Sequence, residues 1–120
     1  MPPRLESLKA WTQSKQVARD AYRASMEQPL CRHFRLADQI RGAANSVPAN
    51  IIEGYALGTR PQLVRCLRIA FASACELSWH IEMAGDMDLL PSARTQTLQA
   101  DIDTLIKLLV GLIKKLSGKG

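Results

Sequence analysis

Large apolar residues near the end of the chain recur at alternating steps of four and three. Leucine or isoleucine occupies positions 98, 102, 105, 109, 112 and 116. This is the a/d spacing of a helix that buries one narrow seam against other helices. A β-strand cannot use this spacing, because its successive side chains point to opposite faces. The seam therefore predicts an all-α fold in which this helix packs lengthwise against its neighbours.

Earlier segments carry related patterns. Apolar residues at 67, 70, 74, 77, 81 and 84 repeat the seam, and Leu8, Trp11, Ala18, Tyr22 and Met26 form a looser version. A further apolar segment, "AANSVPANIIEG" at 43–54, lies between them. No segment alternates with the period of two that a half-buried strand requires.

Helix-ending and helix-starting residues separate these segments. "EQPL" interrupts the first pattern, and Gly58 suits the position just after a helix. Thr59 and Gln62 have the spacing of a capping box, and Ser92 can cap the last helix. We expect one domain over residues 1–120, with helices over about 4–28, 31–57, 60–85 and 92–117. Such helices, joined by short loops, pack as an antiparallel up-down-up-down four-helix bundle.

The composition is typical of a soluble globular protein, with 47% hydrophobic and 22% charged residues. The most apolar stretch, "LIKLLVGLIKKL", is shorter than the roughly 18 apolar residues of a membrane-spanning helix. The first residues lack the apolar segment of a secretory signal, so we expect a cytoplasmic protein. Cys31, Cys66 and Cys75 show no C-x-x-C spacing. We expect them to be reduced, small apolar groups, with no metal or cofactor.

The segment 60–85 has more apolar surface than one seam needs. A second stripe lies beside the first and consists of Val64, Phe71, Cys75, Trp79 and Met83. A helix that is apolar nearly all round is buried on both sides, so we expect this stripe to form an interface between subunits. The alternative is that these are scattered exposed apolar residues, which are common on protein surfaces.

Two segments resemble a known family. "LADQIRGAANSVPANIIEG" and "LRIAFASACELSWHIEMA" are similar to the bacterial four-helix bundle proteins encoded in intervening sequences of 23S ribosomal RNA genes, and more distantly to Avd, the accessory protein of diversity-generating retroelements. The shared pattern falls on Trp11, Gln39, Ala43, residues 46–54, Ser73, Glu76 and Leu77. Ala72 stands where the family has glycine, and Val47 replaces isoleucine.

The resemblance implies a left-handed antiparallel bundle that assembles as a homopentamer, and it does not imply an enzyme. In the Avd branch, basic pentamers bind nucleic acid and a reverse transcriptase. The resemblance therefore gives RNA, DNA and a nucleic-acid enzyme such as a reverse transcriptase as candidate partners, besides the chain itself.

Pro48 stands inside a predicted helix, where it has no N–H to donate to the carbonyl of Ala44. Nearby polar side chains can compensate by hydrogen bonding within a buried cluster. We expect Asn50 and Glu53 to meet Ser73 and Glu76 across the contact between the second and third helices. The structural polar network predicted in this way comprises Ser46, Pro48, Asn50, Glu53, Ser73 and Glu76.

The alternative role for Glu53 and Glu76 is a carboxylate pair that holds a metal or performs acid–base chemistry. Metal sites of four-helix bundles use a Glu-x-x-His motif on each of two helices. Glu76 and His80 are instead four residues apart, which favours the structural network.

Charge is distributed unevenly along the predicted bundle. One end collects eight cations against Glu6 and Glu53, namely Arg4, Lys9, Arg60, Arg65, Arg68, Lys114, Lys115 and Lys119. Carboxylates outnumber cations at the other end, and Lys107 is placed near the middle. The C-terminal lysines complement a helix dipole, but cations at 60, 65 and 68 oppose one.

This basic end predicts binding to RNA or DNA backbones without sequence readout. The alternative is a protein-interaction scaffold without nucleic-acid binding. A lysine-rich helix lying on a membrane surface is less consistent with the apolar seam of residues 98–116, which suits a bundle core. No nucleophile motif, phosphate-binding loop or metal spacing indicates an enzyme.

Overall fold

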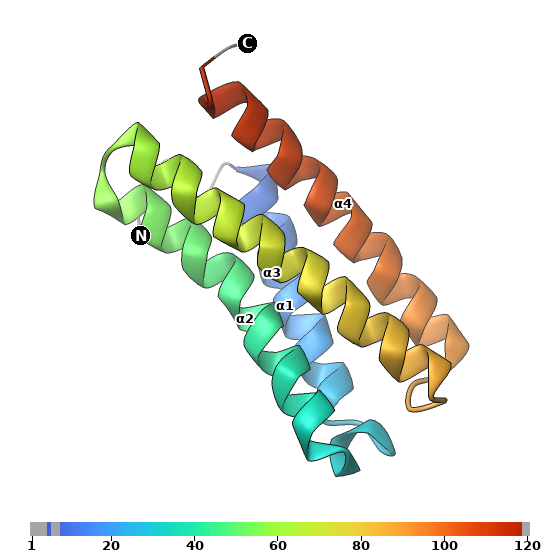
Figure 1. Cartoon of the computed structure of the whole chain (residues 1–120). Coiled ribbons are helices and arrows are strands. Elements are labelled where there is room, and N and C mark those ends of the chain that lie inside the picture. Colours follow the sequence, from blue (N-terminus) through green and yellow to red (C-terminus); the bar gives the residue numbers. More distant parts are fainter. Residues whose placement is uncertain (1–4, 6–7, 119–120) are drawn as a thin grey trace.

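The computed structural model describes Leu5 and residues 8–118, and this part of the chain contains helices and no strand (Figure 1). Four long helices lie side by side as a four-helix bundle: α1 Lys9–Ser25, α2 Phe34–Leu57, α3 Arg60–Asp86 and α4 Ser92–Leu116. A short 3₁₀ helix, η2 Leu30–Arg32, connects α1 to α2. The all-α fold class is confirmed. Within the described residues, no helix has the length and apolar character needed to cross a membrane.

The helix boundaries differ from the expected ones mainly between α1 and α2. α1 ends at Ser25 rather than near residue 28. There, the N–H groups of Met26 and Glu27 bond to carbonyls three residues back, and such bonds tighten a final turn. The 3₁₀ helix follows, so α2 begins at Phe34 and not at residue 31. Residue 4, where the sequence predicts the first helix to begin, lies outside the described residues.

The start of α3 has the expected cap, and the start of α4 does not. Thr59 Oγ1 accepts a hydrogen bond from the backbone N–H of Gln62 (3.4 Å) and donates one to Gln62 Oε1 (2.8 Å). Gly58 ends α2 in a left-handed conformation with φ of 87°, which glycine adopts at little cost. Ser92 is already helical, and Pro91 occupies the cap position without a side-chain hydrogen bond. The prediction of a Ser92 cap is therefore wrong.

The connections between helices divide between the two ends of the bundle. In Figure 1 the α2–α3 loop and the C-terminal end of α4 lie at one end, together with the start of α1. The α1–α2 and α3–α4 connections lie at the other end. Residues at the start of α3 therefore share an end of the molecule with residues from the end of α4.

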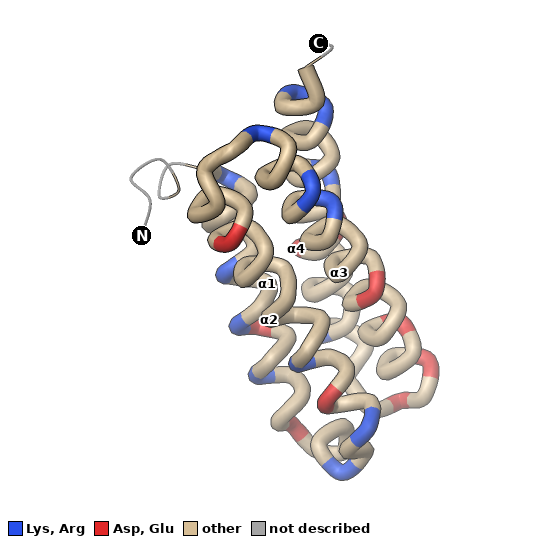
Figure 2. The backbone as a smooth tube through the Cα atoms, turned by 60° about the vertical axis from the view of Figure 1, so that its left-hand side comes forward, with Lys and Arg blue, Asp and Glu red and all other residues tan. Residues whose placement is uncertain are grey.

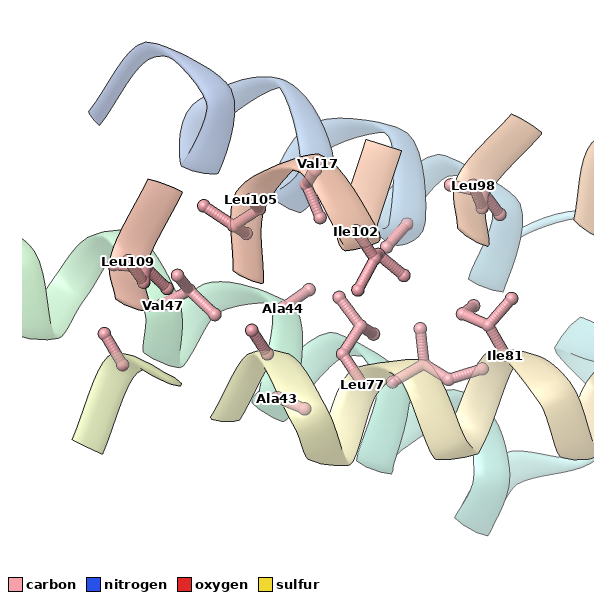
Figure 3. Packing of buried hydrophobic residues seen from close by; sticks show 14 of the residues in the cluster. Val17, Ala43, Ala44, Val47, Leu77, Ile81, Leu98, Ile102, Leu105 and Leu109 are labelled. Carbon is pink, nitrogen blue, oxygen red and sulfur yellow. The ribbon is translucent and has the colours of Figure 1, made fainter. Parts of the chain in front are cut away.

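The core follows the long axis of the bundle (Figure 3). Residues of the two predicted seams are fully or almost fully buried, namely Leu67, Ala70, Ala74, Leu77, Ile81, Ala84, Leu98, Ile102, Leu105 and Leu109. Near the end of α4 the seam moves, because Ile113 is buried and Leu112 is only half-buried. A helix has 3.6 residues per turn, so a seam with a period of 3.5 drifts around it unless the helices supercoil.

Small residues of α2 allow it to approach α3 closely. Ala43, Ala44 and Gly54 are all buried. A Cβ atom added to Gly54 would lie 2.9 Å from both Cys66 Cβ and Leu63 Cδ1. The close contact between the end of α2 and the start of α3 therefore depends on the missing side chain of Gly54, and it positions the cations at the start of α3.

Candidate nucleic-acid interface

Six of the predicted contact residues lie at one end of the bundle, which we call the basic end (Figure 2). The six, all exposed, are Lys9 at the start of α1, Arg60, Arg65 and Arg68 at the start of α3, and Lys114 and Lys115 in the last turn of α4. The remaining two predicted residues, Arg4 and Lys119, lie outside the described residues. The fold thus gathers cations from three helices that are distant in sequence.

Within the described part of the chain, the six cations of the basic end form no ion pair with a carboxylate. Three arginines elsewhere do have such partners. Arg94 lies 3.0 Å from Glu27, and two further arginines pair with carboxylates three residues away on their own helices, Arg23 with Asp20 and Arg41 with Asp38. The charge of the basic end is therefore available to an external anion.

Two grooves bring the cations of different helices together. The α3–α4 groove has a volume of about 690 Å³ and is lined by Arg68, Phe71, Val110, Ile113, Lys114, Lys115 and Ser117. The α1–α4 groove has a volume of about 280 Å³ and is lined by Leu8, Lys9, Ala10, Lys107, Leu108, Gly111, Leu112 and Lys115. Lys115 borders both grooves, so the positive surface is continuous around the end of α4.

Lys107 belongs to this surface, although the sequence places it near the middle of the bundle. It lines the α1–α4 groove with Lys9 and Lys115. Residues four apart share a helix face, and Lys107 and Lys115 are two such steps apart. From that spacing, the sequence could have predicted that Lys107 lies on the same face of the helix as Lys115.

Arg60, the first residue of α3, is electrostatically unfavourable for its own helix. The first turn of α3 contains no acidic residue, and the N-terminus of a helix carries a partial positive charge. Arg60 therefore adds to the charge of the helix end, whereas Lys114 and Lys115 complement the end of α4. A cation placed against a helix dipole is better explained by an external anion than by helix stability.

The polar residues around Pro48 form hydrogen bonds with partners that differ from those expected. Ser46 Oγ lies 2.8 Å from Ser73 Oγ and links α2 to α3. Asn50 Nδ2 donates to the Ser46 carbonyl at 2.8 Å and to Ser46 Oγ at 3.1 Å. Because Asn50 lies one turn after Ser46, its amide reaches the backbone of its own helix. α2 continues through Pro48.

The two carboxylates of the predicted network have separate partners. Glu53 Oε2 accepts a hydrogen bond from the Cys66 thiol at 3.8 Å, and Glu76 Oε2 lies 3.1 Å from His80 Nε2 on its own helix. The expected contact of Asn50 and Glu53 with Ser73 and Glu76 is therefore not the one that forms. The links across the helices are made instead by the serine pair and by Glu53 with Cys66.

Cys66 is held as a neutral thiol. Burial raises its pKa, and the charge of Glu53 and the hydrogen bond to Glu53 raise it further, while Arg65 has the opposite effect. A protonated thiol is a hydrogen-bond donor and a poor nucleophile. The arrangement of Glu53 and Cys66 is thus suited to structural support of the α2–α3 contact.

The second apolar stripe of α3 is only partly exposed. Cys75 and Trp79 are exposed, whereas Val64, Phe71 and Met83 are half-buried. Phe71 packs against the core and lines the α3–α4 groove. Residues four apart advance by 400° around a helix, so the stripe drifts from the α4 side at Phe71 towards the α2 side at Met83.

Trp79 and Met83 lie beside the start of α2, around a hollow that also includes Phe34 and Leu36. Phe34 is 77% exposed and Trp79 is 53% exposed. Phe34 is not among the residues predicted from the sequence, because it lies in "RHFR", outside every apolar pattern. An aromatic residue beside several cations was the available signal. This aromatic pair is at the end opposite the basic end.

Comparisons with known proteins agree with this fold. A protein of unknown function from the S23 ribosomal protein family of Bacteroides thetaiotaomicron has a crystal structure that matches with a TM-score of 0.79 and 23% sequence identity, covering 88% of this chain and 98% of that chain. No curated protein matches the chain. The family model described as 23S rRNA-intervening sequence protein matches residues 6–111. The chain therefore belongs to the 23S rRNA-intervening sequence protein family.

Proposed function

We propose that this protein is a non-enzymatic, oligomeric module of the cytoplasm that binds the phosphate backbone of RNA or DNA through its basic end. The observation that carries this proposal is the group of six exposed cations without carboxylate partners among the described residues. A cation that neutralises a phosphate releases condensed counterions, which favours binding. An arginine already paired with a carboxylate must first lose that partner.

Binding of this kind reads charge rather than sequence. Phosphate contacts fix the position of a protein on a nucleic acid, whereas contacts to base edges or stacked bases provide sequence information. The exposed aromatic residues Phe34 and Trp79 border a hollow with the start of α2, away from the basic end. We therefore expect similar affinities for unrelated RNA sequences of equal length.

We further propose that the helices form a left-handed, antiparallel up-down-up-down bundle, and that copies of it assemble as a homopentamer. If the bundle axes run parallel to the ring axis, the basic end of each subunit repeats around one rim. This arrangement multiplies the number of phosphate contacts along one nucleic acid chain. The same ring could serve as an adaptor for a nucleic-acid enzyme such as a reverse transcriptase.

The test is RNA binding by a triple variant, Arg60→Gln with Arg65→Gln and Arg68→Gln. RNA retention is measured by filter binding at several salt concentrations, and the variant should retain less RNA than the wild type. The slope of log K against log[salt] should also become less steep by about two, because each lost phosphate contact on a single strand removes about 0.7. The matched control is Arg19→Gln with Arg32→Gln and Arg35→Gln. These three arginines are also exposed and lie away from the basic end, so their variant should bind RNA as the wild type does.

Two results would contradict the proposal. One is no retention of RNA or duplex DNA by the wild type at low salt. The other is an equal loss of binding in both triple variants, since that would show a response to net charge alone. Circular dichroism of both variants establishes that the helices are intact.

A second candidate function is a protein-interaction scaffold that does not bind nucleic acid. It is favoured by the exposed aromatic pair Phe34 and Trp79, because large exposed apolar residues beside one another usually have a partner. A partner retained after nuclease treatment and in high salt, and lost in Phe34→Ser, would support this candidate.

A further inference from the structure

The α3–α4 groove has a chemistry that phosphate binding does not use. Phe71, Val110 and Ile113 give it an apolar lining, and the cations Arg68, Lys114 and Lys115 border it. Ile113 is buried and Phe71 is half-buried, whereas the three cations are exposed, so the apolar residues form the floor and the cations the rim. A phosphate group is strongly hydrated and gains nothing from an apolar floor.

The shape of the groove favours an elongated occupant. Its α4 residues run from Val110 to Ser117, a length of about 10 Å at 1.5 Å per residue. α3 and α4 spread apart towards this end of the bundle (Figure 1). The floor is open to solvent, because Val110 is 37% exposed. Small-molecule sites bury most of their ligand, but a helix can cover an open groove with one face.

The charge of the lining indicates which kind of helix fits. The groove is bordered by three cations, and none of the described residues that line it carries a carboxylate. We propose that the α3–α4 groove binds an acidic amphipathic helix of a partner protein. Apolar residues of that helix, at spacings of three and four, cover Phe71, Val110 and Ile113. Aspartate or glutamate residues on its flanks pair with Arg68, Lys114 and Lys115.

This inference does not depend on nucleic-acid binding, but it shares residues with it. Arg68, Lys114 and Lys115 belong both to the basic end and to the rim of the groove. A bound acidic helix therefore competes with RNA for these cations. Arg60 and Arg65 belong to the basic end alone, since neither lines the groove.

The test measures binding of a synthetic peptide to the full chain by fluorescence anisotropy. The probe is a fluorescein-labelled peptide of about 18 residues, long enough to form a helix, with leucine at i, i+3, i+4 and i+7 and glutamate on both flanks. We expect saturable binding to the wild type. Val110→Asp, and separately Lys114→Glu with Lys115→Glu, should each weaken it about tenfold, a change typical of a lost apolar or charged anchor.

The matched control for Val110→Asp is Ile69→Asp. Ile69 is 40% exposed and also lies on a long helix, but it does not line the groove, so this variant should bind the peptide normally. Arg60→Gln with Arg65→Gln should weaken RNA retention and leave the peptide affinity unchanged. The groove and the nucleic-acid proposal can therefore fail independently.

Several outcomes would overturn the inference. They are equal binding of a scrambled peptide of the same composition, equal binding of polyglutamate, an equal loss of affinity in Ile69→Asp, or no binding to the wild type. Sedimentation of Val110→Asp identifies a different occupant, because dissociation of an oligomer by this variant would show that a second copy fills the groove. Saturable binding of sodium oleate without binding of the peptide would assign the groove to a fatty acid instead.

Discussion

At the residue scale, Gly54 and Gly42 of α2 occupy different environments although both are helical. A Cβ atom at Gly54 would lie within 2.9 Å of two side-chain atoms on α3, whereas one at Gly42 would meet nothing within 4 Å. Gly54 is the last residue of the family pattern at 46–54, and the positions of Leu63 and Cys66 explain why a side chain does not fit there. Gly42 retains the usual entropic cost of glycine in a helix without such a reason.

The two alanine substitutions should therefore have opposite effects on stability. Gly54→Ala should lower the free energy of unfolding by about 1–3 kcal/mol, because it overpacks the α2–α3 contact. Gly42→Ala should raise it by about 0.5–1 kcal/mol, because alanine restricts the unfolded chain and favours the helix. Urea unfolding followed by circular dichroism measures both. A Gly54→Ala protein as stable as Gly42→Ala would contradict the observed close packing.

The thiols of Cys75 and Cys66 should react at different rates. Cys75 is exposed and Cys66 is buried, and the pKa of Cys66 is raised by burial and then by Glu53. The folded pKa of Cys66 lies above its unfolded value, so its contribution to stability is present below about pH 9 and decreases as the pH rises further. At pH 8, a thiol-reactive disulfide reagent should label Cys75 rapidly and Cys66 only on unfolding.

The corresponding variants check this order. Cys75→Ser should remove the fast phase of labelling that belongs to Cys75, and Cys66→Ser should leave that phase intact. Loss of the fast phase in Cys66→Ser would show that the thiol of Cys66 is accessible and reactive in the folded protein.

At the scale of single helices, local sequence signals explain some boundaries and fail at others. The Thr59 cap of α3 and the glycine after α2 follow from residue type alone, because both act on backbone groups within a few positions. The end of α1 depends on hydrogen bonds that lead into the 3₁₀ helix. The residue types on either side of Pro29 do not predict that α1 ends at Ser25 or that a short 3₁₀ helix precedes α2.

The cap of α3 should contribute measurably to stability, since this helix carries three cations of the basic end. Thr59→Ala should lower the free energy of unfolding by about 1 kcal/mol, as for other N-caps. The control is Thr97→Ala on an exposed position inside α4, which should not lower stability, because alanine favours a helix more than threonine does. Thermal or urea unfolding of the two variants compares them, and equal stability would show that the 3.4 Å contact contributes little.

At the scale of the whole molecule, helix order decides which charges become neighbours. Lys9, Arg68 and Lys115 are far apart in the sequence, yet two adjacent grooves bring all three to one end of the bundle. Arg94 is instead neutralised by a contact between elements, because it lies 3.0 Å from Glu27. Net charge alone, +5 for the chain, does not distinguish these two kinds of cation.

The proposed assembly gives a prediction at this scale. Trp79→Glu should shift the sedimentation of the protein from an oligomer to a smaller species, because a charge would replace a large apolar contact residue. The matched control is Met87→Glu, which alters a residue of similar exposure (58% against 53%) outside the α3 stripe. It should leave the oligomer unchanged. A wild-type protein that sediments as a monomer at micromolar concentration would contradict the assembly.

The sequence by itself determined the four long helices, their seams and the family, because helix periodicity and short motifs are local properties of the chain. It also indicated that cations gather at one end, since helix order follows from short connections. Only the tertiary structure decided that Ser46 rather than Asn50 links α2 to α3 and that Lys107 joins the basic end. The α3–α4 groove was likewise visible only in the fold. The physical reason is that these features depend on how helices rotate and separate, and side chains a few ångströms apart in space carry no shared signal in one sequence.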